Sequence, residues 1–220
     1  MEDAVKAVEW VIVHAKRLGG NCRGIFLSGH SAGANIAANL VTGPWLEEVL
    51  VAHAEAAILG IVGISGVYTS IKPCGDSYLY NKAFKKMYAD PVFGSDLDLL
   101  IQHSPIQQVM RALDEDPVPS CLLNNLLRPH FRETAHFKDK TPIIKVKKSL
   151  HFLIMNAEND LGLDHCGRAF RDILTRHLGA EKVRYERYPG TAHASIAIYE
   201  NSLALACAFM TDIYSKKFSL

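Results

Sequence analysis

The sequence has almost no net charge, since 24 lysine and arginine residues face 23 aspartate and glutamate residues and leave +1 at pH 7. Proteins that bind nucleic acid or anionic membranes normally carry a basic excess. No apolar run reaches the length of about 18 residues that a membrane-spanning helix needs, and Met1-Glu2-Asp3 lacks the basic start of a signal peptide. We therefore expect a soluble, intracellular chain, cytoplasmic by default, that binds no nucleic acid. A membrane anchor would have to lie in a further amino-terminal part.

Cysteine pairs and metal-ligand spacings are also missing. The five cysteines are Cys22, Cys74, Cys121, Cys166 and Cys207. They are scattered and show no C-x-x-C spacing, so we expect reduced thiols rather than a disulfide framework. His130 and His136, and the run Asp164-His165-Cys166, lack a recognised ligand spacing. Because no glycine-rich phosphate loop is present either, the sequence predicts neither a metal nor a cofactor.

Short apolar runs alternate with amphipathic segments along the chain. Hydrophobic residues make up 49% of the 220 residues, enough for one domain with a sizeable core. The runs predict strands over 23–28, 56–66, 150–156 and 182–188. Helices are expected over 3–18, 34–41, 164–178 and 195–214. The alternation predicts a single α/β domain over 1–220, with a mostly parallel sheet and helices on both faces.

The sequence makes more specific predictions for the first helix and for the long segment after the second strand. The first helix should bury one apolar face and end at Gly19-Gly20. That face is formed by Ala4, Val5, Val8, Val11, Ile12, Ala15 and Leu18. Residues from about 67 to 148 carry most of the prolines and only short helical patterns. A connection this long inside a compact domain is usually a lid or a binding insertion, so we expect it to shape a pocket.

A Gly-His-Ser-Ala-Gly motif occupies 29–33, between a short apolar strand and an alanine-rich helix. This context is typical of a nucleophile elbow, a sharp turn that exposes a serine at the end of a strand. Gly29 and Gly33 are expected to leave room where a side chain would clash. On this interpretation Ser31 is a nucleophile, and the N–H of Ala32 at the helix start contributes to an oxyanion site. An ordinary tight turn between strand and helix is the alternative.

Asp160 and His193 follow the last two predicted strands. A serine hydroxyl needs a base within hydrogen-bond reach and an acid that orients that base. Active residues of open α/β sheets gather at the carboxyl ends of the strands, so Ser31, Asp160 and His193 are expected to converge. Asp164 is the competing acid, and Asp160 is favoured because it follows the strand more closely. Each residue also has a plainer interpretation, as a turn aspartate and a loop histidine.

His30 is the histidine nearest to Ser31 in the sequence. It is tied to the elbow and cannot freely approach the Ser31 hydroxyl, so we do not expect it to be the base. We interpret it as a structural residue or as a pocket-lining residue that contacts substrate.

The motifs together resemble the α/β-hydrolase superfamily and, within it, carboxylesterase groups. Residues 29–37 are similar to the G-x-S-A-G-x-x-x-A elbow of these enzymes, and 156–160 and 188–193 look like their acid and histidine loops. The chain order of serine, acid and histidine is also theirs. Gln102-His103-Ser104-Pro105 is similar to a link in isoprenylcysteine methylesterases and kynurenine formamidases, which we prefer to the related hormone-sensitive-lipase-like esterases.

The resemblance also implies parts that the sequence before Ser31 does not show. Members of these groups carry further strands and a His-Gly-Gly loop ahead of the elbow, whose N–H groups complete the oxyanion hole. We therefore expect an amino-terminally incomplete α/β-hydrolase fold with an exposed edge on the elbow strand. Losing one oxyanion donor lowers the rate about 10² to 10³ fold, so the chain alone is expected to be a poor catalyst.

The resulting hypothesis is a serine hydrolase that cleaves a small-molecule ester or amide through an acyl-enzyme. An aryl formamide or an isoprenylcysteine methyl ester is the more specific possibility that the resemblance implies. The alternative hypothesis is a non-catalytic protein of the same fold that binds a small molecule or a partner.

Overall fold

A four-stranded parallel sheet organises the chain in the computed structural model, which describes residues 1–69, 99, 102–113, 148–160 and 162–219. The strands are β1 (Ile25–His30), β2 (Ile58–Ile64), β3 (His151–Asn159) and β4 (Val183–Ala192), in the order β1-β2-β3-β4. All neighbours are parallel, with register pairs such as Leu27 with Ile61 and Ile154 with Tyr185. The predicted parallel α/β sheet is confirmed.

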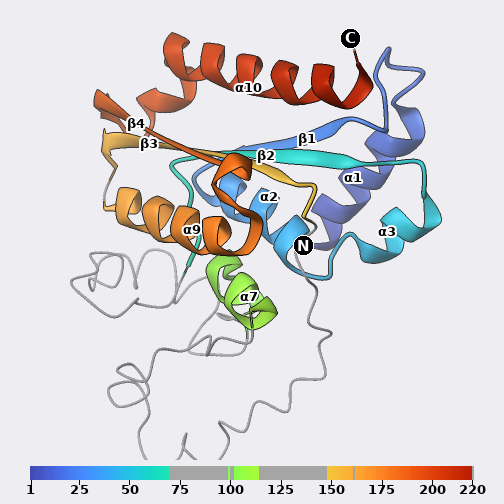
Figure 1. Ribbon diagram of the computed structural model, residues 1–220, viewed down its shortest axis with the longest axis horizontal. Coiled ribbons are helices and arrows are strands. Elements are labelled where there is room, and N and C mark those ends of the chain that lie inside the picture. Colours follow the sequence, from blue (N-terminus) through green and yellow to red (C-terminus); the bar gives the residue numbers. More distant parts are fainter. Residues whose placement is uncertain (70–98, 100–101, 114–147, 161, 220) are drawn as a thin grey trace, which may run out of the picture.

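Helices cover both faces of this sheet (Figure 1). One face carries α10 (Glu200–Phe218), which follows the short 3-10 turn η5 (Ser195–Ile198). The other face carries α1, α2, α3, α7 and α9. Their bounds are Glu2–His14 (α1), Ala32–Thr42 (α2), Glu47–Ala52 (α3), Pro105–Ala112 (α7) and Leu163–Leu178 (α9). A second 3-10 turn, η4 (Ala180–Lys182), leads from α9 into β4.

The core forms one cluster on each side of the sheet. Successive strand residues point to opposite faces, so Ile61 joins the cluster beneath α2 and α9 while Val62 joins the cluster beneath α10. Every residue of β2 is buried, as expected of a strand covered on both faces. This burial fixes the register of the sheet and hence which strand ends meet.

The first helix is shorter than predicted and buries a narrower face. It ends at His14, and Leu18 lies beyond it with 59% of its surface exposed. Val8, Ile12 and Ala15 are buried, whereas Val11 is 40% exposed. A step of 100° per residue turns Val11 away from the line that the other three share. The prediction for Val11 and Leu18 was therefore wrong.

Other boundaries also differ from the predictions. Residues 47–52, which lie outside the predicted helices, form α3. β1 is shifted by two residues from its predicted range, β2 is shorter by two residues at each end, and β3 and β4 end three and four residues later than predicted. Of the predicted insertion at 67–148, only 67–69, 99, 102–113 and 148 lie within the described residues, and they include α7. None of the helices within the described ranges is long and apolar enough to cross a membrane.

Candidate active site

Ser31 occupies a strained turn between β1 and α2, where its backbone has φ 55 and ψ −118. A non-glycine residue in such a conformation costs about 1 to 3 kcal/mol and persists only when its surroundings fix it. Two hydrogen bonds do so here. The Ser31 N–H donates to the Ile64 carbonyl of β2 (2.9 Å), and the Ala34 N–H donates to the Ser31 carbonyl (3.1 Å). The serine is thereby held at the carboxyl end of the sheet.

The two glycines around Ser31 have different roles. A Cβ atom at Gly29 would lie 2.2 Å from the Gly33 carbonyl oxygen and 2.6 Å from the Ala34 nitrogen, so α2 packs directly on β1 at this point. At Gly33, an added Cβ would meet no described atom within 4 Å. The expectation of a clash is therefore confirmed for Gly29, and at Gly33 no described atom produces one.

Ser31, His193 and Asp160 form a continuous chain of hydrogen bonds. His193 Nε2 lies 3.0 Å from Ser31 Oγ, and His193 Nδ1 lies 2.6 Å from Asp160 Oδ1. An ionised carboxylate only accepts hydrogen bonds, so Asp160 retains the imidazole proton on Nδ1 and leaves Nε2 to accept the Ser31 hydroxyl proton. The three side chains come from the ends of β1, β3 and β4 and meet although they are far apart in sequence.

The Asp160 carboxylate is buried, and hydrogen bonds hold it in place. It is 2% exposed, and its Oδ2 accepts hydrogen bonds from Asn156 Nδ2 (2.7 Å) and the Ala157 N–H (3.2 Å). A Cβ at Gly167 of α9 would lie 2.0 Å from Asn156 Oδ1, so only glycine leaves room for this amide. Sequence reasoning missed Asn156. A polar residue directly after the apolar run 152–155 was the available signal, because buried amides need partners.

The competing acid, Asp164, has a different environment. It lies in the first turn of α9 and pairs with Arg168 of the same helix (3.3 Å) and with Arg187 of β4 (3.5 Å). Two arginines thus compensate its charge. Among the described residues Asp164 forms no ion pair with His193, whose Nδ1 lies against Asp160 instead.

His30 contacts the backbone of His193. Its Nε2 lies 2.7 Å from the His193 carbonyl oxygen, and the two rings stack at a tilt with centroids 4.7 Å apart. Because an acceptor can only be matched by an N–H, this bond fixes a proton on His30 Nε2. Of the two roles expected for His30, structural or substrate-contacting, this bond to the backbone of His193 is a structural one.

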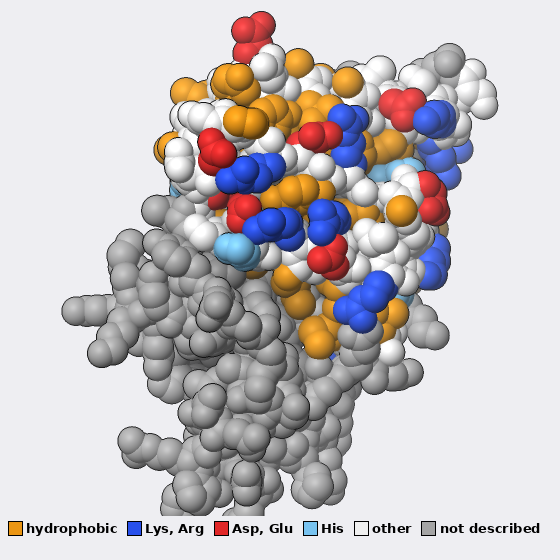
Figure 2. Space-filling view, turned by 60° about the vertical axis from the view of Figure 1, so that its left-hand side comes forward, with side chains coloured by type: hydrophobic (Ala, Val, Ile, Leu, Met, Phe, Trp, Pro, Cys, Tyr) orange, Lys and Arg blue, Asp and Glu red, His pale blue; other side chains and the backbone are white. Residues whose placement is uncertain are grey.

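The loops that carry Asp160 and His193 are also tied to each other. The His193 N–H donates to the Asn159 carbonyl (3.2 Å), and the Gly190 N–H donates to Glu158 Oε2 (2.9 Å). Glu158 pairs in turn with Arg187 (3.2 Å). Figure 2 shows basic and acidic side chains intermingled on the side of the molecule that it turns forward, in keeping with these pairs. Glu158 was placed in the acid loop at 156–160 from the sequence but was assigned no role of its own.

Two asparagines of α2 fix the segments beside the elbow. Asn35 Nδ2 donates to the carbonyls of Val67 (2.6 Å) and His103 (3.2 Å), and Asn39 Nδ2 donates to His103 (2.9 Å). The residues lie four apart and therefore on one face of the helix. They anchor the link before α7 to the same helix that follows Ser31. Paired asparagines in an alanine-rich helix were the sequence signal for this role.

Ala32 is the first residue of α2. The first N–H groups of a helix have no intrahelical acceptor, and the helix dipole makes this end partly positive. The N–H groups beside Ser31 are therefore suited to stabilise a negative oxygen.

Two fully buried residues with titratable side chains, Tyr68 and Cys166, are in contact in the core. The Tyr68 N–H donates to Cys166 Sγ (3.0 Å). Burial raises the pKa of the Cys166 thiol to about 12 and raises the pKa of the Tyr68 phenol well above its ordinary value, with the negative charge of Asp160 acting in the same direction. Both groups therefore stay neutral. Across the described part of the chain, no group of three or more histidine, cysteine or carboxylate residues is arranged to hold a metal ion.

Comparisons with known proteins agree with this architecture. A family model described as alpha/beta hydrolase fold matches residues 1–114. No curated protein gives a significant sequence match. Among solved structures, carboxyl esterase 2 from the mycorrhizal fungus Tuber melanosporum superposes with a TM-score of 0.54 at 17% identity, covering 94% of this chain and 59% of that one.

Two further structures give the same result. One of two fungal esterases from Rhizomucor miehei has a TM-score of 0.56 at 20% identity and covers 98% of this chain and 60% of that one. An arylesterase has a TM-score of 0.57 at 16% identity, with 96% and 58% covered. Identity this low supports the fold alone. The chain spans about three fifths of the length of each of these proteins.

Proposed function

Because the chain belongs to the alpha/beta hydrolase fold family, we propose that it is a serine hydrolase that cleaves small carboxylic esters. The observation that carries this proposal is the hydrogen-bond chain from Ser31 Oγ through His193 to the buried Asp160 carboxylate. A serine hydroxyl is a weak nucleophile without a base, and a histidine base needs a group that holds it in one tautomer. His193 supplies the base, and Asp160 supplies the group that holds it in one tautomer.

The first half of the proposed reaction forms an acyl-enzyme. Ser31 Oγ attacks the ester carbonyl carbon while His193 Nε2 takes the hydroxyl proton. Asp160 stabilises the resulting imidazolium through the 2.6 Å bond to Nδ1. When the tetrahedral intermediate collapses, the bond to the alcohol breaks and His193 returns the proton to the leaving oxygen.

The second half repeats these steps with water. His193 takes a proton from water, the hydroxide attacks the acyl carbon, and Ser31 leaves with the proton that His193 returns. The Ala32 N–H and the positive end of α2 stabilise the oxyanion of each intermediate. This stabilisation lowers the barrier because the negative charge develops only as the intermediate forms. We assign Ala32 as one oxyanion donor on this basis.

Among esters the proposed substrate is an isoprenylcysteine methyl ester. The alternative substrate is an aryl formamide, an amide that the same steps would cleave with an amine in place of the alcohol. The support is the resemblance of the link at 102–105 to the corresponding link in enzymes that act on these compounds. In the structure, Asn35 and Asn39 hold the His103 carbonyl of this link against α2. The link thus lies against α2, the helix that begins at the elbow, and we propose that it contributes to a substrate pocket.

Steady-state hydrolysis tests the proposal. We expect measurable cleavage of p-nitrophenyl acetate, loss of that activity in Ser31→Ala, and normal activity in Ser28→Ala, an exposed serine on the same strand. A farnesylcysteine methyl ester and N-formylkynurenine separate the two substrate classes. Hydrolysis that survives Ser31→Ala would refute the proposed mechanism. Ester binding without any turnover would favour the non-catalytic alternative.

A further inference from the structure

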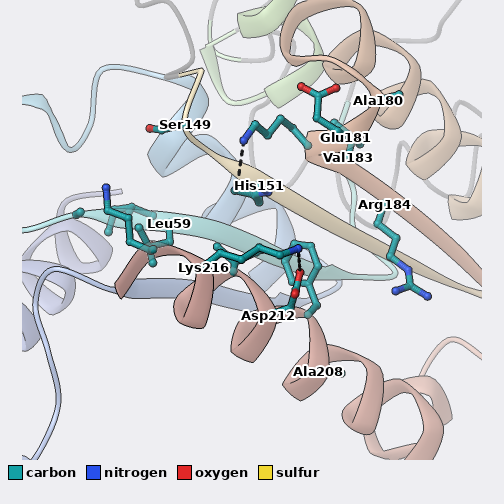
Figure 3. A pocket seen from close by; sticks show the side chains of 16 residues that line it. Leu59, Ser149, His151, Ala180, Glu181, Val183, Arg184, Ala208, Asp212 and Lys216 are labelled. Atoms are coloured by element: carbon teal, nitrogen blue, oxygen red, sulfur yellow. Dashed lines mark hydrogen bonds and ion pairs between the residues drawn. The ribbon is translucent and has the colours of Figure 1, made fainter. Parts of the chain in front are cut away.

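A pocket lies at the opposite end of the sheet from Ser31. It has a volume of about 740 Å³ and is lined by the first residues of β2, β3 and β4 together with the last turns of α10 (Figure 3). Since Ser31, Asp160 and His193 follow the carboxyl ends of parallel strands, a strand length of roughly 20 to 30 Å separates the two places. Its size is that of a site for a small organic ligand.

Positive charge prevails in this pocket. Four of its lining residues are lysine or arginine and two are carboxylates. Of these, Lys216 is neutralised by Asp212 at 2.7 Å. Arg184 is paired with Glu186 at 2.9 Å, and its guanidinium points away from His151 in Figure 3.

Glu181, the other carboxylate of the lining, points away from His151 (Figure 3). Its oxygens lie over Gly179, within 2.7 Å of the position of an added Cβ. Two cations therefore remain uncompensated. Lys217 has no ion-pair partner among the described residues, and Lys182 makes one hydrogen bond, from Nζ to His151 Nε2 at 3.2 Å.

Lys182 retains donors for a ligand. An ammonium group has three N–H donors, of which His151 accepts one. Burial and the nearby Lys182 charge lower the pKa of His151, so the imidazole is neutral and can accept that bond. The arrangement orients the lysine without cancelling its charge. It therefore leaves a positioned cation at the edge of the cavity.

The opposite side of the pocket is apolar. Ile58 and Leu59 at the start of β2, Val183 of β4, and Phe209 and Ile213 of α10 all contribute to the lining. A purely inorganic anion would leave this wall uncovered, and a neutral hydrocarbon would leave the two lysines without a partner. The lining fits a ligand that has an anionic head and an apolar body.

We propose that this pocket binds an organic anion, with Lys182 receiving its carboxylate, the charge of Lys217 adding to the attraction, and the β2, β4 and α10 side chains covering its apolar body. The ligand class is a medium-chain aliphatic or an aromatic carboxylate. The site is separate from the serine site and stands or falls independently of the proposed hydrolase activity.

Binding of octanoate below its micellar concentration tests the proposal. Calorimetry is expected to show saturable binding of octanoate, with 1-octanol and inorganic phosphate at least tenfold weaker. Lys182→Gln and Lys217→Gln should each weaken octanoate by about fivefold, the upper effect of one partly exposed ion pair. Lys6→Gln removes the same charge from the exposed surface of α1 and should change nothing.

The site of binding is read from the histidine ring signals in NMR spectra. Octanoate is expected to shift the His151 signals and to leave those of His193 in place. Shifts at His193 alone, or an affinity that the two lysine variants leave unchanged, would overturn the proposal. Equal affinity for octanol would do so as well, because the lysines would then contribute nothing. Since Lys217 is exposed, its variant remains informative even if Lys182→Gln fails to fold.

Discussion

Replacing Gly29 by alanine adds a methyl group at a point where the backbone of α2 leaves no space. The new Cβ would lie 2.2 Å from the Gly33 carbonyl oxygen, whereas non-bonded atoms normally stay roughly 3.5 Å apart. The end of β1 and the start of α2 must therefore separate by roughly 1 Å. Because the obstacle is backbone rather than a flexible side chain, we expect a loss near the upper end of the about 1 to 3 kcal/mol seen for overpacking.

The same displacement acts on the proposed chemistry. Ser31 lies two residues after Gly29, and its Oγ is 3.0 Å from His193 Nε2. A shift of about 1 Å breaks that bond and is expected to lower the acylation rate about 100-fold. The matched variant is Gly33→Ala, whose Cβ meets no described atom and which should be as stable as the parent or slightly more stable. Urea unfolding of both variants gives the comparison. Free energies of unfolding that agree within about 0.5 kcal/mol would refute the reasoning.

Three further substitutions give separate tests. Asp160→Asn keeps the shape of the acid but no longer fixes the tautomer of His193, so esterase kcat should fall about 10³ to 10⁴ fold, and a fall below tenfold would contradict the assigned role. His30→Phe removes the bond to the His193 carbonyl and should lower kcat about tenfold with KM unchanged, whereas an effect on KM alone would indicate substrate contact. Burial raises the pKa of Cys166 from 9.0 to about 12, so its thiol stabilises the fold below pH 9 and loses that contribution as the pH rises toward 12. The free energy of unfolding should therefore fall by up to roughly 1.4 kcal/mol per pH unit over this range. The fall should be less steep in Cys166→Ala and as steep as in the parent in Cys207→Ala. Identical slopes in the two variants would contradict the prediction.

The sheet and the order of its strands could be predicted because their signals are local. The apolar run at 56–66 indicates a strand covered on both faces, and β2 is buried throughout. Boundaries were less accurate, since they depend on partners elsewhere in the chain. β4 continues through Pro189 and Gly190 to Ala192 because its pairing with β3 shifts register between Ala157 and Asn159, and such a bulge tolerates a proline.

The environment of the candidate site could be predicted only in part. The residue types and their chain order singled out Ser31, Asp160 and His193, but no local pattern specifies how they are held. Asn156 lies beneath the acid because Gly167, on another element, leaves it room. Contacts of this kind join residues far apart in the sequence, so they emerge only with the tertiary structure. The distinction between Gly29 and Gly33 has the same origin.

Covalent labelling with a fluorophosphonate tests most directly whether Ser31 is the nucleophile. The probe reacts with serines that an adjacent base activates, and mass spectrometry locates the modified residue. We expect phosphonylation of Ser31 that is abolished in Ser31→Ala, strongly slowed in Asp160→Asn and unchanged in Ser28→Ala. An unlabelled chain, a label on another residue, or labelling that persists in Ser31→Ala would contradict the proposed active site.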